Sequence, residues 1–87
     1  MADSGDKRPR LILYSRQYCH LCDDMLAAVE SLRGELGFEL DAVDVDAEPE
    51  LARRYDELVP VLMHGERELA HWRIDSSAIR AYLRDIG

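Results

Sequence analysis

Two cysteines, Cys19 and Cys22, are the residues of this chain best suited to covalent chemistry, and they stand three positions apart. Two cysteines placed at random in a chain of 87 residues would have this spacing about 2% of the time. A reversible dithiol needs one exposed, ionised sulfur that attacks a disulfide, and a second sulfur that displaces the product from the mixed disulfide. The spacing therefore predicts a redox-active pair, with Cys19 as the nucleophile and Cys22 as the resolving thiol.

An amphipathic helix is predicted to position both cysteines. Apolar residues recur at spacings of four, four and three between His20 and about Arg33, and Gly34 and Gly37 are predicted to end the helix. The residues of this apolar stripe are Leu21, Met25, Val29 and Leu32. Cys19 then lies at the helix start, where unpaired backbone N–H groups and the positive end of the helix favour a thiolate.

Charged neighbours are expected to act on Cys19 in opposite directions. Arg16 and a protonated His20 would stabilise its thiolate. Asp23 and Asp24, in the first helical turn, would oppose it. We expect the thiolate to be favoured overall, by an amount that depends on this local balance of charge.

Two strands are predicted to flank that helix in the sequence. Leu11–Tyr14 is a short, continuously apolar run, which is typical of a central strand that is buried on both faces. Phe38–Val45 alternates apolar with acidic residues and has one slip of phase, which indicates a second strand that could contain a bulge. Its acidic side chains are interpreted as a solvated edge that discourages pairing with further strands.

The second half of the chain predicts a short helix, a hairpin and a final helix. Capping residues over Asp46–Pro49 precede the short helix, and the hairpin turn falls at His64–Glu66. Pro60 is placed at the start of a strand, where the missing N–H is tolerated. The short helix has Leu51, Tyr55 and Leu58 on its apolar side, and the two strands of the hairpin are Val59–Met63 and Glu68–Trp72. The final helix follows the capping residues Asp75–Ser77. Its apolar face consists of Ile79, Tyr82, Leu83 and Ile86.

The predicted order of elements is βαβαββα. The first strand, helix and second strand form a right-handed βαβ unit, so these two strands are parallel, and a hairpin follows. A Cys-x-x-Cys pair at the junction of a buried strand and a helix in such a unit is typical of a thioredoxin-like redox fold. The predicted class is therefore α/β, with its redox site at Cys19 and Cys22.

Composition argues against several other classes of protein. The chain has 18 acidic and 11 basic residues and a formal net charge of −7, which disfavours nucleic acids and anionic membranes as partners. Its length predicts one folded domain, residues 9–87, after a disordered leader, residues 1–8. The polar N-terminus and the small number of cysteines are unlike a secreted disulfide scaffold and favour a reducing cytoplasm. No apolar run approaches the length of a membrane span.

Tyr14–Cys22, followed by Val59-Pro60-Val61-Leu62, resembles the glutaredoxin branch of the thioredoxin superfamily, and Cys-His-Leu-Cys is similar to the motif of small glutaredoxin-like proteins found mainly in bacteria. The resemblance covers residues 10–86. It implies a four-stranded mixed sheet in the order 2-1-3-4, flanked by helices. It also implies a cis peptide bond before Pro60, which would pack against the cysteines while Val59 offers a backbone edge to a substrate's disulfide.

The same resemblance implies a set of binding residues. Arg16 stands where many glutaredoxins keep a cation that meets a carboxylate of glutathione. Asp75, with the N–H groups of Ser76 and Ser77 expected to be free, matches the family's segment for the γ-glutamyl group. The chain departs from the family where Trp72–Ile74 replaces a Gly-Gly pair. The candidate substrate-binding or glutathione-binding residues are Arg16, Tyr18, His20, Val59, Pro60, Asp75 and Ser76.

Plainer interpretations stay open for several of these side chains. Arg16 could be a solvated arginine, and His20 could point to solvent instead of tuning the thiolate. Trp72 could pack at the rim of the core instead of serving as a platform for a substrate. These alternatives differ in what each side chain contacts, so a structure can distinguish them.

The predicted function is a glutaredoxin-like thiol-disulfide oxidoreductase that reduces or exchanges disulfides through Cys19 and Cys22. We expect a monomer without a bound cofactor or metal, whose partner is a disulfide-containing protein or a glutathione mixed disulfide, with glutathione as a co-substrate. One alternative is an iron-sulfur or zinc protein that uses the same cysteines, shared by two chains. The other is a non-catalytic thioredoxin-fold binding module in which the segment around Trp72 excludes glutathione.

Overall fold

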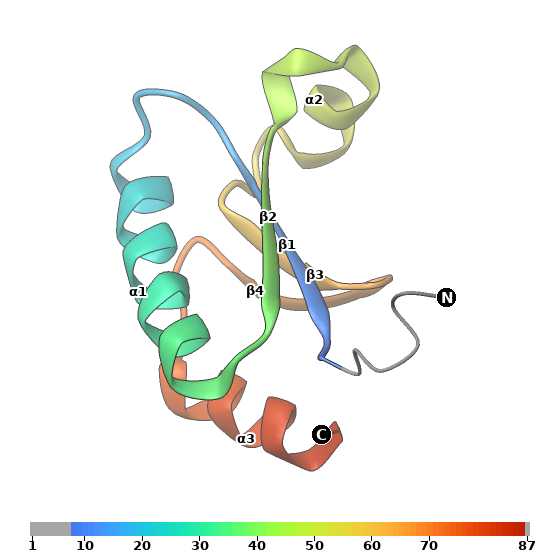
Figure 1. Ribbon diagram of the computed structural model, residues 1–87. Coiled ribbons are helices and arrows are strands. Elements are labelled where there is room, and N and C mark those ends of the chain that lie inside the picture. Colours follow the sequence, from blue (N-terminus) through green and yellow to red (C-terminus); the bar gives the residue numbers. More distant parts are fainter. Residues whose placement is uncertain (1–7, 87) are drawn as a thin grey trace.

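The computed structural model describes residues 8–86, which form a four-stranded sheet with helices on both faces (Figure 1). In chain order the elements are β1 (Arg10–Ser15), α1 (His20–Leu36), β2 (Glu39–Asp44), the 3-10 helix η2 (Val45–Ala47), α2 (Pro49–Tyr55), β3 (Val61–His64), β4 (Arg67–His71) and α3 (Ser76–Ile86). The predicted order βαβαββα is confirmed, with η2 as an additional helical turn. The predicted leader lies outside the described residues, apart from Arg8.

The sheet has the strand order β2-β1-β3-β4, as the resemblance implied. β1 pairs in parallel with β2 and brings Ser15 opposite Asp44. β3 runs antiparallel to β1 and β4, and Tyr14 lies opposite Val61. β1 and β2 finish at the end of the sheet where β3 begins. The segments after Ser15 and Asp44 and the segment before Val61 therefore meet at this end of the sheet.

Side chains of the central strands alternate between two apolar clusters, one on each face of the sheet. On one face, Leu11, Leu13 and Leu62 are buried under α1 and α3. On the other face, Val61 packs with Tyr55 of α2. This alternation follows from the pleat of a strand, in which successive side chains point to opposite faces. The central strands are therefore covered on both sides, as the apolar first strand predicted.

The bulge considered for the second strand lies elsewhere in the sheet. The register between β1 and β2 advances without a shift, whereas a shift falls between β3 and β4 at Leu62 and Met63. The alternation of apolar and acidic residues over Phe38–Val45 changes phase for another reason, which is that this segment contributes apolar residues to both faces of the sheet. Leu40 packs against the cluster under α1 and α3, and Val45 is buried in the cluster under α2.

Helix α1 is longer than predicted and ends at the second of the two predicted glycines. It begins after Cys19, continues through Gly34 and stops at Leu36. Gly37 then adopts a left-handed backbone (φ 77°), and its N–H donates to the carbonyl of Arg33 at 2.8 Å. A left-handed residue at a helix end is usually glycine because a Cβ atom disfavours that conformation. Gly34 stays helical, so the prediction that it helps to end the helix is wrong.

The buried face of α1 is shifted by one residue at its start. It consists of Cys22, Met25, Val29 and Leu32. Leu21, which the spacing predicted to open this stripe, is 41% exposed. The prediction for Leu21 is wrong because a spacing of three from Cys22 to Met25 fits a helical stripe as well as a spacing of four does. An exposed leucine therefore lies beside the cysteines.

The second helix is shorter than predicted, and its expected capping residues have another role. α2 ends at Tyr55, and Leu58 packs against the same cluster from the turn that follows. Glu48, the residue before α2, makes no side-chain cap. The carboxylate of Asp44 instead caps η2, since it accepts the backbone N–H of Asp46 at 2.9 Å. The polar segment after β2 therefore starts a 3-10 turn before α2 begins.

The hairpin and the last helix follow the predictions with small shifts. β3 begins two residues later and β4 one residue earlier than expected, and Gly65 in the turn has a left-handed φ of 61° that suits glycine. Asp75 caps α3 as predicted, because its carboxylate accepts the N–H groups of Ser77 and Ala78 at 3.1 and 3.2 Å. Ile86 departs from the prediction and is 44% exposed, since the buried side of α3 ends one turn earlier.

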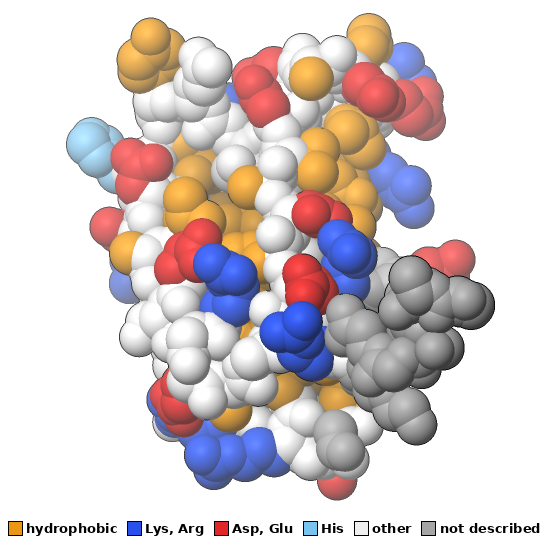
Figure 2. Space-filling model, viewed as in Figure 1, with side chains coloured by type: hydrophobic (Ala, Val, Ile, Leu, Met, Phe, Trp, Pro, Cys, Tyr) orange, Lys and Arg blue, Asp and Glu red, His pale blue; other side chains and the backbone are white. Residues whose placement is uncertain are grey.

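Oppositely charged side chains lie side by side near the edge strand β2, and hydrophobic side chains are visible on either side of this strand (Figure 2). Arg8 pairs with Glu39 at 3.1 Å, and Arg10 pairs with Asp41 at 2.8 Å. All four groups are substantially exposed, so each pair contributes little to stability. The acidic residues of this strand therefore form the solvated edge that the sequence indicated.

Candidate active site

The two cysteines lie where β1 has ended and α1 begins. Cys19 is the N-cap residue of α1, and its Sγ accepts the backbone N–H of Cys22 at 3.1 Å. The carbonyl of Cys19 accepts the first intrahelical bond from the N–H of Asp23 at 3.0 Å. A thiol thus occupies the position that usually holds serine or aspartate, whose side-chain oxygen takes up an unpaired N–H. In the reduced protein, the same N–H would stabilise negative charge on the sulfur.

The cysteine pair is joined as a disulfide, with a Cα–Cα distance of 5.2 Å. Cys22 is only 3% exposed, whereas Cys19 is partly exposed. A partner that approaches from solvent therefore meets Cys19 first, which suits a nucleophile with a protected resolving thiol. Across residues 8–86, His, Cys, Asp and Glu side chains form no group of three or more that could hold a metal ion.

The two residues that flank Cys19 are exposed. Tyr18 is fully exposed, and its backbone has a left-handed φ of 58°. Such a conformation costs a non-glycine residue roughly 1–2 kcal/mol. His20 is also exposed. Among the described residues, neither side chain has a hydrogen-bond or ion-pair partner, and the roles expected for Tyr18 and His20 stay predictions.

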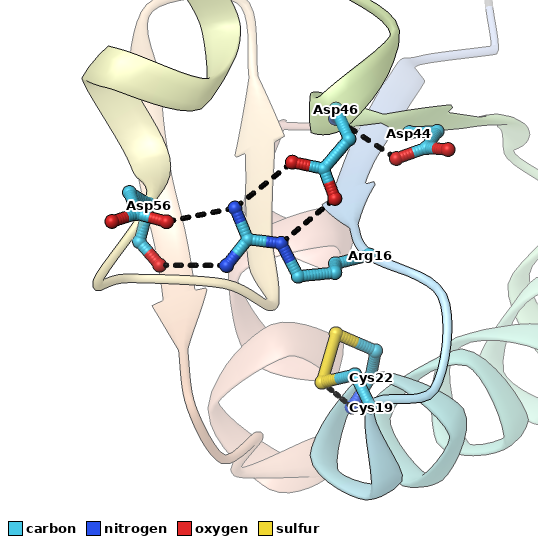
Figure 3. A network of polar contacts seen from close by, with 6 residues as sticks. All are labelled: Arg16, Cys19, Cys22, Asp44, Asp46 and Asp56. Atoms are coloured by element: carbon cyan, nitrogen blue, oxygen red, sulfur yellow. Dashed lines mark hydrogen bonds and ion pairs between the residues drawn. A yellow bond between two sulfur atoms is a disulfide. The ribbon is translucent and has the colours of Figure 1, made fainter.

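The guanidinium of Arg16 is held by two carboxylates on one side of the cysteine pair (Figure 3). Its Nε and Nη2 donate to the two carboxylate oxygens of Asp46 at 3.0 and 3.1 Å. Nη2 also donates to the carboxylate of Asp56 at 2.7 Å. Hydrogen bonds raise the pKa of Arg16 above its ordinary value, and the bonds to Asp46 contribute more than the bond to Asp56. Arg16 is therefore not freely solvated, and its guanidinium already binds two carboxylates of this chain.

Sequence reasoning missed both partners of Arg16. Asp46 could have been found, because parallel strands end at one edge of a sheet and Asp46 follows the second strand as Arg16 follows the first. Asp56 comes just after α2, from the turn before β3, and no periodicity in the sequence indicates this contact. We call Arg16, Asp46 and Asp56 the polar flank of the site.

The Val59–Pro60 peptide bond is cis, which confirms what the resemblance implied. Pro60 is buried, and its carbonyl accepts the N–H of Trp72 at 3.0 Å. The N–H of Val59 donates to the carbonyl of Tyr55 at 3.1 Å. The backbone edge expected at Val59 for a substrate therefore has its N–H already engaged within the chain.

The segment expected to hold a γ-glutamyl group begins with the cap of α3. Asp75 uses its carboxylate to accept the N–H of Ser77, so the expectation that this N–H is free is wrong. Side-chain capping satisfies donors that a ligand's carboxylate would otherwise meet. Ser76 is the first residue of α3 and is partly buried. The binding roles expected for Asp75 and Ser76 stay predictions.

A cleft of about 290 Å³ lies on another side of the cysteine motif. It is lined by Leu21, Asp24 and Met25 of α1 and by Trp72, Arg73 and Ile74 of the segment after β4. Trp72 is 51% exposed and has a left-handed φ of 64°. We call these six residues the Leu21–Trp72 cleft. The sequence placed Trp72 at a rim or platform, but the exposure of Leu21 opposite it was not expected.

A β2-β1-β3-β4 sheet, helices on both faces and a Cys-x-x-Cys pair at the start of α1 together define a thioredoxin-fold protein. The germline-specific thioredoxin Deadhead of Drosophila melanogaster shares the fold, with a TM-score of 0.63 over 99% of this chain and 88% of that chain, at 22% identity. More narrowly, residues 10–84 match the family described as Glutaredoxin-like domain (DUF836), and the chain belongs to this family. The family resemblance seen in the sequence is thereby confirmed.

Bacterial proteins show higher similarity. The solution structure of protein Ne2328 from Nitrosomonas europaea is 39% identical, with a TM-score of 0.76 over 88% of this chain and 93% of that chain. The crystal structure of protein XcR50 from X. campestris is 34% identical, with a TM-score of 0.72 over 86% and 96%. An uncharacterized protein of Mycobacterium tuberculosis is 30% identical over 79 residues, which are 85% of this chain and 81% of that protein. The glutaredoxin-like fold and the cysteine pair together indicate a redox role.

Proposed function

We propose that this protein is a thiol-disulfide oxidoreductase that acts through Cys19 and Cys22. The observation that supports this most directly is the N-cap position of Cys19, whose Sγ accepts a backbone N–H at 3.1 Å. That bond and the positive end of α1 favour the thiolate, which is the attacking form. The burial of Cys22, one helical turn away, protects the second thiol until a mixed disulfide has formed.

The proposed reaction starts from the reduced dithiol. The Cys19 thiolate attacks one sulfur of a substrate disulfide, forms a mixed disulfide and releases the other substrate sulfur as a thiolate, which takes up a proton. The Cys22 thiol then loses its proton and attacks the Cys19 sulfur. This second exchange releases the remaining substrate thiol and forms the Cys19–Cys22 disulfide. The substrate gains two electrons and the protein loses two.

Regeneration of the dithiol requires a reductant from outside the chain, for which we propose glutathione or a thioredoxin reductase. The proposed substrate is a disulfide in a protein or a glutathione mixed disulfide, the proposed setting is the cytoplasm, and the protein is proposed to act as a monomer. No helix within residues 8–86 is long and apolar enough to cross a membrane. Neither nucleic acid nor a membrane has a part in the proposed reaction.

The proposal is tested by a single turnover of the full chain, reduced beforehand and freed of reductant. The reduced protein is mixed with hydroxyethyl disulfide, and the appearance of the Cys19–Cys22 disulfide is followed by mass spectrometry after alkylation. We expect Cys19→Ser to slow reduction of the substrate on the order of a thousandfold or more, because the nucleophile is lost. Cys22→Ser should accumulate the mixed disulfide on Cys19 instead.

Two outcomes would contradict the proposal. One is a Cys19→Ser variant that reduces the substrate as fast as the wild-type chain, and the other is a wild-type dithiol that reduces no disulfide. The reductant is identified separately, by steady-state turnover with glutathione and with a thioredoxin reductase. Trapping with Cys22→Ser then recovers the substrate as a stable mixed disulfide.

A further inference from the structure

Large apolar side chains gather at the cysteine motif without being buried. Among the described residues, the exposed large apolar side chains are Tyr18, Leu21, Trp72 and Ile86. Tyr18 and Leu21 are in or next to the Cys19–Cys22 motif, and Trp72 shares a cleft with Leu21. Exposed apolar groups concentrated at one place on a small protein usually mark a surface that another molecule covers.

The Leu21–Trp72 cleft has the composition of a small recognition site. Four of its six lining residues are apolar, namely Leu21, Met25, Trp72 and Ile74, and the other two, Asp24 and Arg73, are charged, so the surface of the cleft combines apolar and polar groups. Interfaces typically combine an apolar centre with a charged, solvated rim. A volume of about 290 Å³ is at the lower end of the range of ligand sites, so it suits a side chain better than a large cofactor.

Trp72 is fixed in place although half of it is exposed. Its indole N–H donates to the carbonyl of Glu57 at 2.9 Å, and its backbone N–H donates to the carbonyl of Pro60 at 3.0 Å. The left-handed backbone of Trp72 is unfavourable for so bulky a residue and is maintained by these surroundings. Met25, which is 2% exposed, closes the floor of the cleft. The Trp72 side of the cleft is therefore preformed.

The position of the cleft relates it to the proposed attack by Cys19. Leu21 is the second residue of α1 and precedes Cys22, and Cys19 is the N-cap residue just before the helix, so the three residues lie within about one turn, which advances about 5.4 Å along the helix. Consecutive Cα atoms of a polypeptide are about 3.8 Å apart. A polypeptide whose cysteine sulfur reaches Cys19 can therefore place a neighbouring side chain in the cleft.

The polar flank does not offer the feature that a small anionic thiol requires. Glutathione carries two carboxylates, and a guanidinium free to receive one of them would favour its binding. The guanidinium of Arg16 is instead bound by Asp46 and Asp56 (Figure 3). Any carboxylate that approaches it meets two others, so this flank disfavours an anionic ligand.

We infer that the preferred substrate is a polypeptide disulfide with an apolar side chain next to its cysteine, and that this side chain enters the Leu21–Trp72 cleft while the substrate sulfur meets Cys19. This inference rests on the proposed function. The exchange is the one described above, in which the Cys19–S bond forms as the substrate S–S bond breaks and Cys22 completes the two-electron reduction. The cleft adds binding energy from apolar contact with the residue beside the reacting sulfur.

The test compares two peptide disulfides that differ only in the residue next to the cysteine, which is leucine in one and serine in the other. Glutathione disulfide is the third substrate. The full chain is reduced beforehand, and the second-order rate constant for its oxidation is measured with each disulfide. We expect the leucine peptide to react about tenfold faster than the serine peptide, since covering most of one apolar side chain is worth that factor.

Two variants alter opposite walls of the cleft, and one variant serves as a matched control. Leu21→Ser and Trp72→Ala should each reduce the preference for the leucine peptide to about threefold, because each removes about half of the apolar contact and hence half of its free energy. Ile86→Ser removes a side chain of similar exposure from the end of α3 and should leave the tenfold preference unchanged. Circular dichroism and thermal unfolding establish that each variant is folded.

Several outcomes would overturn the inference. A wild-type chain that reacts equally with both peptides, or a preference that persists in folded Leu21→Ser and Trp72→Ala, would show that the cleft is not used. Faster reaction with glutathione disulfide than with the leucine peptide would assign the site to glutathione. A concentration-dependent dimer that Leu21→Ser abolishes would assign the cleft to a second copy of this chain. If hydroxyethyl disulfide also fails to react, the proposed function is wrong as well.

Discussion

The two sides of the cysteine pair differ in whether their side chains have interaction partners within the chain. On the polar flank, Arg16 makes three hydrogen bonds of 2.7 to 3.1 Å to the carboxylates of Asp46 and Asp56. On the other side, Leu21 and Trp72 leave 41% and 51% of their surface exposed. Folding has thus provided partners for the charged groups of the polar flank and left Leu21 and Trp72 partly uncovered.

This difference indicates where a partner is expected to bind. Exposed apolar surface is costly in water, and a chain of this size could have used it to enlarge its core. Ion pairs that are internally satisfied offer little to an incoming ligand, because binding one would break contacts that already exist. Binding of another molecule is therefore expected to lower the free energy more on the open, apolar side than on the polar flank.

The largest expected effect concerns whether the apolar side belongs to the core. Leu62→Ala, in the fully buried centre of β3, should lower the free energy of unfolding by about 2–5 kcal/mol, since it leaves a cavity. Leu21→Ala should lower it by less than about 0.5 kcal/mol, since exposed side chains contribute little to folding. Urea unfolding of both variants measures the contrast. A loss of similar size in the two would place Leu21 in the core and remove the distinction between the sides.

A smaller effect is expected when the polar flank is broken. In a Cys22→Ser background, the double variant Asp46→Asn/Asp56→Asn removes two negative charges and leaves the Arg16 cation uncompensated near the start of α1. We expect alkylation of Cys19 by iodoacetamide at pH 7 to become about twofold faster, because the thiolate is favoured.

The matched control for this variant removes the same charge from the far end of β2. Glu39→Gln/Asp41→Asn breaks the ion pairs with Arg8 and Arg10. These pairs lie toward the start of β1 and β2, whereas the cysteines follow the other end of β1. It should leave the alkylation rate unchanged. An equal increase in both double variants would mean that the net charge of the chain acts on Cys19, and that the polar flank has no particular role.

The smallest effect concerns an ion pair of similar geometry that lies away from the cysteines. Arg80 donates to both carboxylate oxygens of Glu35 at 2.7 and 3.1 Å and joins α3 to α1. The hydrogen bond to Arg80 lowers the pKa of Glu35 below its ordinary value. A lowered pKa in the folded state means that the carboxylate stabilises the fold above the pKa of the unfolded chain, and that this stabilisation is lost as the pH falls through the folded-state pKa.

Glu35→Gln should therefore lower the thermal midpoint slightly at pH 7, and the difference from the wild-type chain should shrink as the pH falls through the folded-state pKa of Glu35. Glu30→Gln breaks a local pair with Arg33 on the same helix and should have a smaller effect at pH 7. A Glu35→Gln difference that grows toward acid would contradict this sign. A small difference would show how little an exposed pair of this kind adds to stability.

The sequence by itself determined the order of the elements and the place of the cysteines. Apolar runs and spacings located the strands and helices to within a few residues, because burial on one face imposes a period that is visible locally. The same local rules placed Cys19 at a helix start and Asp75 at a cap. They failed at Leu21, where two stripes one residue apart fit the helical period almost equally well.

Only the tertiary structure decided which side of the cysteine pair is closed and which is open. Arg16 meets Asp46 and Asp56 across 30 and 40 positions of sequence, and Trp72 meets Glu57 across 15. Such contacts depend on which loops the strand order brings to one edge of the sheet, and no repeating pattern along the chain records them. Periodicity reports the burial of a side chain within its own element, whereas its choice of partner depends on how distant elements pack.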